Sequence, residues 1–226
     1  MISHKHKCIF IHIPKCAGTS IETALGHFDN HTGRDGQDHR SIRMVEKPIV
    51  ISNILSSEEN IIDFLRRVRH IFRGAENPYN KFTITKEQYD SYFKFTFVRN
   101  PWSRAYSWYK NVMRDEIHKK NHKITEKLSL NEFLRLYSGK GMLKPQLYWI
   151  KNFAGNIPLD YVGRFETLLE DFEKIREAIH APGITLPHKT KGQVDDYRAH
   201  YDEDSIKMIM ENYKEEIEMF GYSFDS

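Results

Sequence analysis

Apolar residues gather in three short runs along the chain that predict β-strands. Residues 8–13 (CIFIHI) are almost entirely apolar, which is typical of a central strand buried on both faces. Residues 93–98 (FKFTFV) alternate and are rich in aromatic and β-branched side chains, and residues 161–163 form a shorter run of the same kind. We therefore expect three strands, well separated in the sequence.

Elsewhere, apolar positions recur at the spacing of a helix. The pattern predicts helices over 19–28, 41–47, 61–72, 102–120, 130–137, 142–153, 167–180 and 203–219. Asn100 is a good N-cap and Pro101 suits the first helical position, so the second strand leads directly into a helix. Gly221 is a plausible C-cap for the last helix.

Strands followed by helices, twice over, favour an α/β domain with a parallel sheet. No linker divides the chain, so we expect one domain over residues 1–226. Residues 46–92 are the least readable part, with a turn expected at Asn77-Pro78. We interpret this region as an insertion, a flap over a site.

Composition narrows the functional class only slightly. The formal net charge of +3 and the twelve histidines fit an anionic ligand, but this bias is too weak to indicate nucleic-acid binding. No run approaches the roughly 20 apolar residues of a membrane span. Because the chain starts with the polar residues MISHKHK, we expect no signal peptide. Oligomeric state is not readable from the sequence.

The two cysteines, Cys8 and Cys16, lie near opposite ends of the first predicted strand, which holds them roughly 20 Å or more apart. A disulfide needs Cα atoms within about 7 Å, so we expect no bridge. This usage indicates a reducing compartment, and we expect a cytoplasmic protein.

Side chains suited to binding anions follow the first two predicted strands. After residues 8–13 the chain reads PKCAGTS, placing Lys15 and the hydroxyls of Thr19 and Ser20 at a helix start, where unpaired N–H groups favour anions. Lys15 precedes Gly18, so the spacing is not that of a nucleotide-binding G-x-x-x-x-G-K-[ST] loop. From this loop alone, a phosphate cradle and a simple capped turn are equally good interpretations.

The residues that follow the second predicted strand favour a phosphate-binding site over a simple capped turn. Arg99 leaves this strand, and the Ser107 side chain, two helical turns later, leans back toward it. An arginine with a nearby hydroxyl suits a phosphate group. Ligands of parallel sheets bind beyond the carboxyl ends of the strands. Because the segments after both predicted strands carry residues suited to anions, we expect them to form one binding site.

The runs IHIPKCAGTS, FKFTFVRNPWSRAYSWY and YVGRFETLLEDF, and the ending from LPHKT to FGYSF, occur in the order found in one family. The chain resembles the carbohydrate sulfotransferases that use 3′-phosphoadenosine 5′-phosphosulfate (PAPS), related to heparan 2-O- and chondroitin/dermatan sulfotransferases and their soluble bacterial relatives. The resemblance covers nearly the whole chain apart from residues 46–80. It implies a P-loop-like three-layer fold with a central parallel sheet flanked by helices.

The resemblance also implies an activity: in-line transfer of the sulfonate group of PAPS to an acceptor hydroxyl, with adenosine 3′,5′-bisphosphate (PAP) released. The acceptor would be a glycan, with no metal, no nucleic acid and no membrane span. Two alternatives remain, a P-loop kinase-like nucleotide enzyme and a non-catalytic polyanion-binding protein that uses basic segments such as RVRHIFR.

Site residues follow from the matched motifs, with Lys15 also relieving charge at the leaving oxygen. The resemblance assigns the 5′-phosphosulfate to Lys15, Ala17, Gly18, Thr19 and Ser20, the 3′-phosphate to Arg99 and Ser107, and a basic covering loop to Lys189, Lys191 and Gly192.

A histidine base suits removal of the acceptor proton, and His39 in GQDHRSIRMV is the candidate, with His188 as runner-up. We expect Gln146 to line the acceptor site. His118 and His122, four residues apart, are expected to form an exposed basic face rather than a metal pair.

Overall fold

A computed structural model describes residues 1–33, 36–187 and 196–226. Its sheet has four strands in the order β1 (Ile2–Ser3), β2 (Cys8–Ile11), β3 (Phe93–Val98) and β4 (Tyr161–Arg164). β2, β3 and β4 run parallel, as the sequence predicts, whereas β1 pairs antiparallel to β2. The sequence analysis missed β1, because its flanking residues are polar.

The chain divides into two compact units, which are described separately. Unit 1 comprises residues 1–13, 17–98 and 147–189, and unit 2 comprises residues 14–16, 99–146 and 190–226. No helix within the described parts of the chain is both long and apolar enough to cross a membrane.

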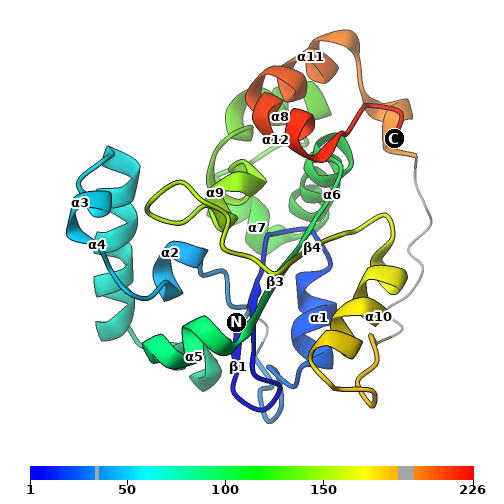
Figure 1. Ribbon diagram of the computed structural model, residues 1–226. Helices are drawn as coiled ribbons and strands as arrows, with labels where there is room; N and C mark the ends of the chain where they lie inside the picture. The colour runs from blue at the N-terminus through cyan, green and yellow to red at the C-terminus, as the bar shows by residue number, and fades with distance from the viewer. Residues whose placement is uncertain (34–35, 188–195) are drawn as a thin grey trace. The chain divides into compact units, whose positions relative to one another are not determined.

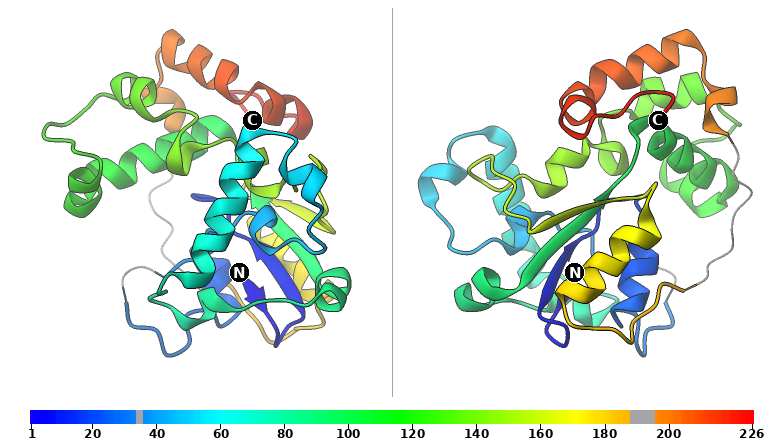
Figure 2. Two further views of the ribbon diagram at one scale, coloured as in Figure 1. Left: turned by 90° about the vertical axis from the view of Figure 1, so that its left-hand side faces the viewer. Right: turned by 45° about the vertical axis from the view of Figure 1, so that its right-hand side comes forward.

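Unit 1 contains the whole sheet and the helices that flank it. These helices are α1 (Gly18–Ala24), α2 (Ile42–Val45), α3 (Ile51–Ile54), α4 (Glu58–Phe72), α5 (Lys86–Ser91) and α10 (Leu168–Ala178), with the 3₁₀ turn η1 at Pro78–Lys81. Figures 1 and 2 show α1 and α10 on one face of the sheet and α2 and α4 on the other. The central strands are buried on both faces, so unit 1 is a mixed α/β structure of the kind expected.

Unit 2 is helical and has its own apolar core. It contains α6 (Pro101–Arg114), α7 (Glu116–Asn121), α8 (Leu130–Tyr137), α11 (Glu203–Asn212) and α12 (Lys214–Phe220), with the 3₁₀ segments η2 (Gly141–Leu143) and η3 (Tyr197–His200); α9 (Gln146–Ile150) begins at its boundary. Trp102, Trp108, Phe133 and Tyr213 pack together in this core. These bulky side chains give α6 a buried face, which leaves its other face for polar residues.

Three predicted helices are interrupted. In place of the predicted helix over 142–153, the structure has the 3₁₀ segment η2 and the short helix α9. The predicted helix over 102–120 ends at Asp115, whose carboxylate accepts the N–H groups of Ile117 and His118 and caps a new helix, α7. The predicted helix over 203–219 is broken at Tyr213, and Gly221, in the left-handed region at φ 64°, ends it as expected. Asn100 caps α6 by accepting from the N–H groups of Trp102 and Ser103, also as expected.

Candidate active site

Lys15 and Arg99 follow the carboxyl ends of two neighbouring strands, because β2 pairs in parallel with β3. Both residues belong to unit 2, and Nη1 of Arg99 donates to the carbonyl oxygen of Lys15 at 3.2 Å. The backbone N–H of Arg99 donates to Oε1 of Gln146, and Nε2 of Gln146 donates to the Arg99 carbonyl oxygen, both at 2.8 Å. Gln146 is fully buried, so instead of lining an acceptor site it fixes the backbone of Arg99.

One face of α6 presents polar side chains beside these two cations. Nε of Arg99 donates to Oγ of Ser103 at 2.9 Å, and Nζ of Lys15 donates to Oδ1 of Asn111 at 3.4 Å. Ser107 lies one turn from each of these partners and shares their face. The hydroxyl bonded to Arg99 is thus Ser103, which the sequence analysis missed, and Ser107 continues the same row.

The ammonium of Lys15 lies in a positive environment. Burial, and after it the charges of Arg99 and Arg114, lower the pKa of Lys15 to about 8. Arg114 stands at the end of the Ser103, Ser107 and Asn111 row on α6. Three cations therefore act on one another in unit 2, and an anion among them would relieve this repulsion.

The backbone of the lysine loop is held in an uncommon conformation. Lys15 has φ 70° and Ala17 has φ 61°, and neither is glycine. Such left-handed residues cost of order 1–3 kcal/mol each and concentrate at functional sites. Left-handed residues in a turn direct successive N–H groups to one side, as in anion-binding loops. Ala17 then precedes the first turn of α1, formed by Gly18, Thr19 and Ser20 without a side-chain cap.

In unit 1, a buried carboxylate and a buried histidine lie next to this first turn. Oε1 of Glu22 on α1 lies 3.0 Å from Nδ1 of His12, just after β2, and also accepts the Asp38 N–H at 3.0 Å. Burial alone would raise the pKa of the Glu22 carboxyl, but His12, the N-terminal amino group and His27 together outweigh burial, so the net pKa is lowered. Glu22 is therefore ionised and links β2, α1 and the segment that contains His39.

Gly18 is required by the close approach of His12. A Cβ at Gly18 would lie 1.9 Å from Cδ2 and 2.0 Å from Nε2 of His12. The imidazole therefore lies directly against the backbone at the start of α1, where only glycine leaves room for it.

His39 stacks on His12 with ring centroids 4.2 Å apart. Nδ1 of His39 faces the His12 carbonyl oxygen at 3.4 Å, and the half-buried ring lies 6.3 Å from the Trp149 ring. Because a carbonyl only accepts, this contact places the proton on Nδ1 and leaves the lone pair on Nε2. Burial lowers the pKa of His39 to about 3, with the charge of His12 acting in the same direction, so the ring is neutral at pH 7.

Neither His12 nor Glu22 was predicted from the sequence. The available signal was the presence of a polar residue within a mainly apolar run.

Other predicted residues are accounted for as follows. His188, Lys189, Lys191 and Gly192 lie outside the described residues, so their roles stay predictions. His118 and His122 do not form an exposed basic face, because both are half-buried and pack edge-on against Trp108. Within the described ranges, no group of three or more His, Cys, Asp or Glu side chains is arranged to hold a metal ion.

The cysteines behave as predicted. Cys8 and Cys16 are both buried, and within the described residues neither forms a disulfide. Sγ of Cys16 faces Oε1 of Gln146 at 3.5 Å, so it fills a small buried position in the lysine loop.

Comparison with known proteins defines the class to which this chain belongs. The model of the sulfotransferase family matches residues 1–223, nearly the whole chain. The chain belongs to the sulfotransferase family. The family resemblance of the sequence motifs is thereby confirmed.

The chain is also similar to one particular protein, carbohydrate sulfotransferase 10 of Xenopus laevis. The two are 25% identical over 253 aligned positions, which cover 98% of this chain and 66% of the relative. The chain thus spans just under two thirds of the length of that relative. No solved structure gives a significant match.

Proposed function

We propose that this protein transfers the sulfonate group of PAPS to an acceptor hydroxyl and releases PAP. The observation that carries the proposal is the cation group of Lys15, Arg99 and Arg114 beside the polar row of α6. Such a group is suited to phosphate and sulfate oxygens, because charged N–H donors and hydroxyls are their preferred partners. Membership of the sulfotransferase family supports the same reaction class.

The proposed donor-binding residues divide into two groups by their position in the sequence. Arg99, with Ser103 and Ser107, would hold the 3′-phosphate, and Lys15 would bind the 5′-phosphosulfate together with the N–H groups and hydroxyls at Ala17, Gly18, Thr19 and Ser20. Bound PAPS would supply an activated sulfonate group whose leaving group is PAP. The positive charge of Lys15 would stabilise the negative charge that develops on the leaving oxygen. Catalysis would thus rest on positioning and electrostatics.

His39 is the proposed base. Its Nε2 carries the lone pair and would accept the proton of the acceptor hydroxyl as that oxygen bonds to sulfur. The low pKa of the free ring keeps it unprotonated before transfer, and negative charge brought by donor and acceptor would raise this pKa.

The acceptor is proposed to be a glycan. The support is the similarity to carbohydrate sulfotransferase 10, whose name gives a carbohydrate as the substrate class. A cytoplasmic location remains a prediction from the cysteine usage.

The test is transfer of labelled sulfonate from PAPS to a panel of glycans, lipids and phenols, with wild type and His39→Asn compared. Asparagine keeps a donor near the position of Nδ1 but has no Nε2 lone pair, so we expect a loss of transfer of about 10²–10⁴-fold. PAP affinity, measured by calorimetry, should stay unchanged. His180→Asn is the matched control, because His180 is exposed and its φ of 52° suits asparagine.

Two outcomes would contradict the proposal. Near-normal transfer by His39→Asn would remove His39 from the mechanism. PAP binding by wild type with no transfer to any acceptor class would favour a binding protein over an enzyme.

A further inference from the structure

Helix α4 in unit 1 has its amphipathic faces reversed. Its buried side carries Asn60, Asp63 and Arg67. Its exposed side carries most of its apolar residues: Ile61, Ile62, Leu65, Val68, Ile71 and Phe72. A helix of a monomeric protein buries its apolar stripe, so this arrangement requires an explanation.

Buried polar contacts fix the helix in this orientation. Asp63, only 1% exposed, accepts from Nε of Arg43 at 2.7 Å and from the hydroxyl of Tyr148 at 2.6 Å. Nη1 of Arg67 donates to the carbonyl oxygens of Arg43 and Glu46 at 2.8 and 3.0 Å. Rolling α4 to bury its apolar side would break these bonds and leave buried charges unpaired, so the apolar side must face outward.

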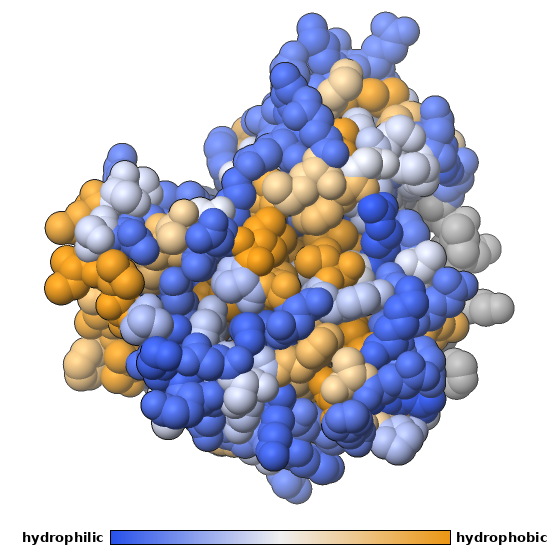
Figure 3. All heavy atoms as spheres, viewed as in Figure 1, coloured by the Kyte–Doolittle hydropathy of each residue, from blue (hydrophilic) through white to orange (hydrophobic). Residues whose placement is uncertain are grey.

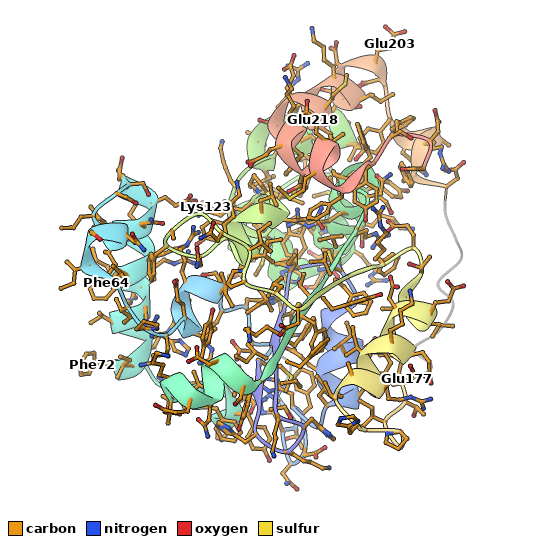
Figure 4. All side chains as sticks on the ribbon, viewed as in Figure 1. Phe64, Phe72, Lys123, Glu177, Glu203 and Glu218 are labelled. Atoms are coloured by element: carbon orange, nitrogen blue, oxygen red, sulfur yellow. The ribbon has the colours of Figure 1, made fainter. Side chains whose placement is uncertain are left out.

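The outward apolar residues continue onto the neighbouring helix α3. Phe72 is 83% exposed and Leu65 60%, while Ile51, the first residue of α3, and Leu55, which follows its last residue, are 72% and 67% exposed. Figure 3 shows this as a connected apolar surface over α3 and α4, and Figure 4 shows Phe72 on the outer side of α4. Contiguous apolar patches of this kind mark interaction sites.

The spacing on α4 matches a helix-pairing seam. Ile61, Leu65, Val68 and Phe72 are separated by four, three and four residues, the spacing of alternating a and d positions in a coiled coil. We call these four residues the α4 seam.

The charges at the two ends of α4 specify the direction of pairing. Glu58 begins the helix and Arg73 follows its last residue, and both are exposed. At 100° per residue they lie on the same side of the seam. Consider a two-fold axis that passes through the middle of the seam and relates two antiparallel copies of α4. Measured along the helix axis, Glu58 of one copy then lies within about 3 Å of Arg73 of the other. A parallel pair would instead place Glu58 against Glu58.

We propose that two copies of this chain associate through antiparallel α4 seams, with Ile51 and Leu55 extending the contact. The same surface serves both copies, as in a closed two-fold dimer, and each interface contains two Glu58–Arg73 pairs. This inference is independent of the proposed function, since no seam residue belongs to the proposed donor or base machinery.

The first test measures the mass of the full chain by sedimentation over a concentration series. Wild type should give a dimer, and Leu65→Lys should raise the dimer dissociation constant at least about tenfold, as loss of a central anchor does. Leu169→Lys is the matched control, because Leu169 is 72% exposed on α10, away from the seam, and should leave the dimer intact. Circular dichroism should show all three proteins folded.

The second test reads the direction of pairing. Glu58→Arg and Arg73→Glu should each weaken the dimer, because each opposes like charges, and the double variant should regain the wild-type dissociation constant within about threefold. A wild type that is monomeric throughout, or a dimer unaffected by Leu65→Lys, would overturn the proposal. Single charge reversals without effect, or a double variant that stays weak, would overturn antiparallel pairing. Monomeric protein that sediments with phosphatidylserine vesicles in a Leu65-dependent manner would show that a membrane surface is the occupant instead.

Discussion

At the scale of single residues, the lysine loop shows how local charge sets a group's chemistry. Lys15 has a pKa of about 8 because it is buried and because Arg99 and Arg114 are also cations. It is therefore mostly protonated at pH 7 but loses its proton within the range in which the protein can be assayed. A bound phosphate group would favour the charged form and raise this pKa. Binding of PAP should then be linked to proton uptake.

We predict that the affinity for PAP falls as pH rises through 8. The protonated fraction of a group with a pKa of 8 falls about tenfold between pH 7 and 9, so PAP affinity should fall by up to that factor. Calorimetry in buffers of different ionisation enthalpy would detect the proton uptake directly. Lys15→Arg stays charged throughout and should give a flat profile. Parallel profiles for the two proteins would show that another group titrates.

Gly18 is the second residue on which the candidate site depends. Gly18→Ala would place a methyl group within 2 Å of the His12 ring, which Glu22 holds in place. We expect a loss of about 1–3 kcal/mol in the free energy of unfolding, measured by urea denaturation, with reduced transfer activity. Gly183→Ala is the control, since nothing lies within 4 Å of a Cβ there. Equal stability of the two variants would show that His12 moves aside freely.

At the scale of secondary-structure elements, α1 joins the parts of unit 1 that carry the proposed base. Glu22 on this helix contacts His12 after β2 and the N–H of Asp38, the neighbour of His39. His39 then stacks on His12 and faces its carbonyl oxygen. The position of the base thus depends on a carboxylate of a different element, which acts as a positioning residue.

We predict that Glu22→Gln lowers kcat roughly tenfold or more while the KM for PAPS stays close to wild type. Glutamine keeps the size and one acceptor but loses the charge that holds His12, so the base would be misplaced without change to donor binding. Steady-state kinetics separate the two constants, and Glu22→Asp should recover part of the rate. Glu177→Gln on the exposed side of α10 is the control. A change in KM alone would place Glu22 in donor binding instead.

The elements also show how far sequence reasoning reaches. The three parallel strands and the caps at Asn100 and Gly221 were predicted, because apolar runs and capping residues are local signals. The breaks at Asp115 and Tyr213 were missed, since helical periodicity continues across both. For α4, periodicity predicted the helix but not the buried side, which depends on distant Arg43 and Tyr148.

In the candidate site, too, some residues could be predicted from the local sequence, whereas others depend on contacts between distant parts of the chain. Lys15 and Arg99 were found because each directly follows a recognisable strand, and β2 and β3 are indeed neighbours. The roles of Ser103, His12 and Glu22 depend on partners brought close only by folding. Sequence spacing alone gives no access to such contacts.

At the scale of the whole molecule, the charge is nearly balanced. The chain has 34 lysines and arginines against 31 aspartates and glutamates, a formal excess of +3. Exposed pairs such as Lys86–Asp90 and Arg135–Asp204 balance charge locally. Under the proposed function, selective anion binding would come from the group of Lys15, Arg99 and Arg114 rather than from a general positive field, which would hold any polyanion.

This local origin predicts which nucleotide stabilises the folded chain. At 100 times its dissociation constant, PAP should add about 2.7 kcal/mol to the free energy of unfolding, a rise of roughly 5–11 °C in Tm for a chain of this size. Differential scanning fluorimetry measures the rise, and ATP with magnesium at the same concentration should give a smaller one. Arg99→Ala should lose most of the PAP shift, whereas Arg135→Ala, exposed in the same unit, should retain it.

The opposite order of nucleotides would indicate a kinase-like enzyme, because the preferred ligand of the native state always gives the larger shift at equal concentration. Equal loss of the shift in Arg99→Ala and Arg135→Ala would indicate a different kind of binding, spread over the surface charge. In that case salt would weaken all polyanions alike, since such binding reflects general screening. Retention of the PAP shift in Arg135→Ala but not in Arg99→Ala would instead trace the selectivity to a donor site at the ends of β2 and β3.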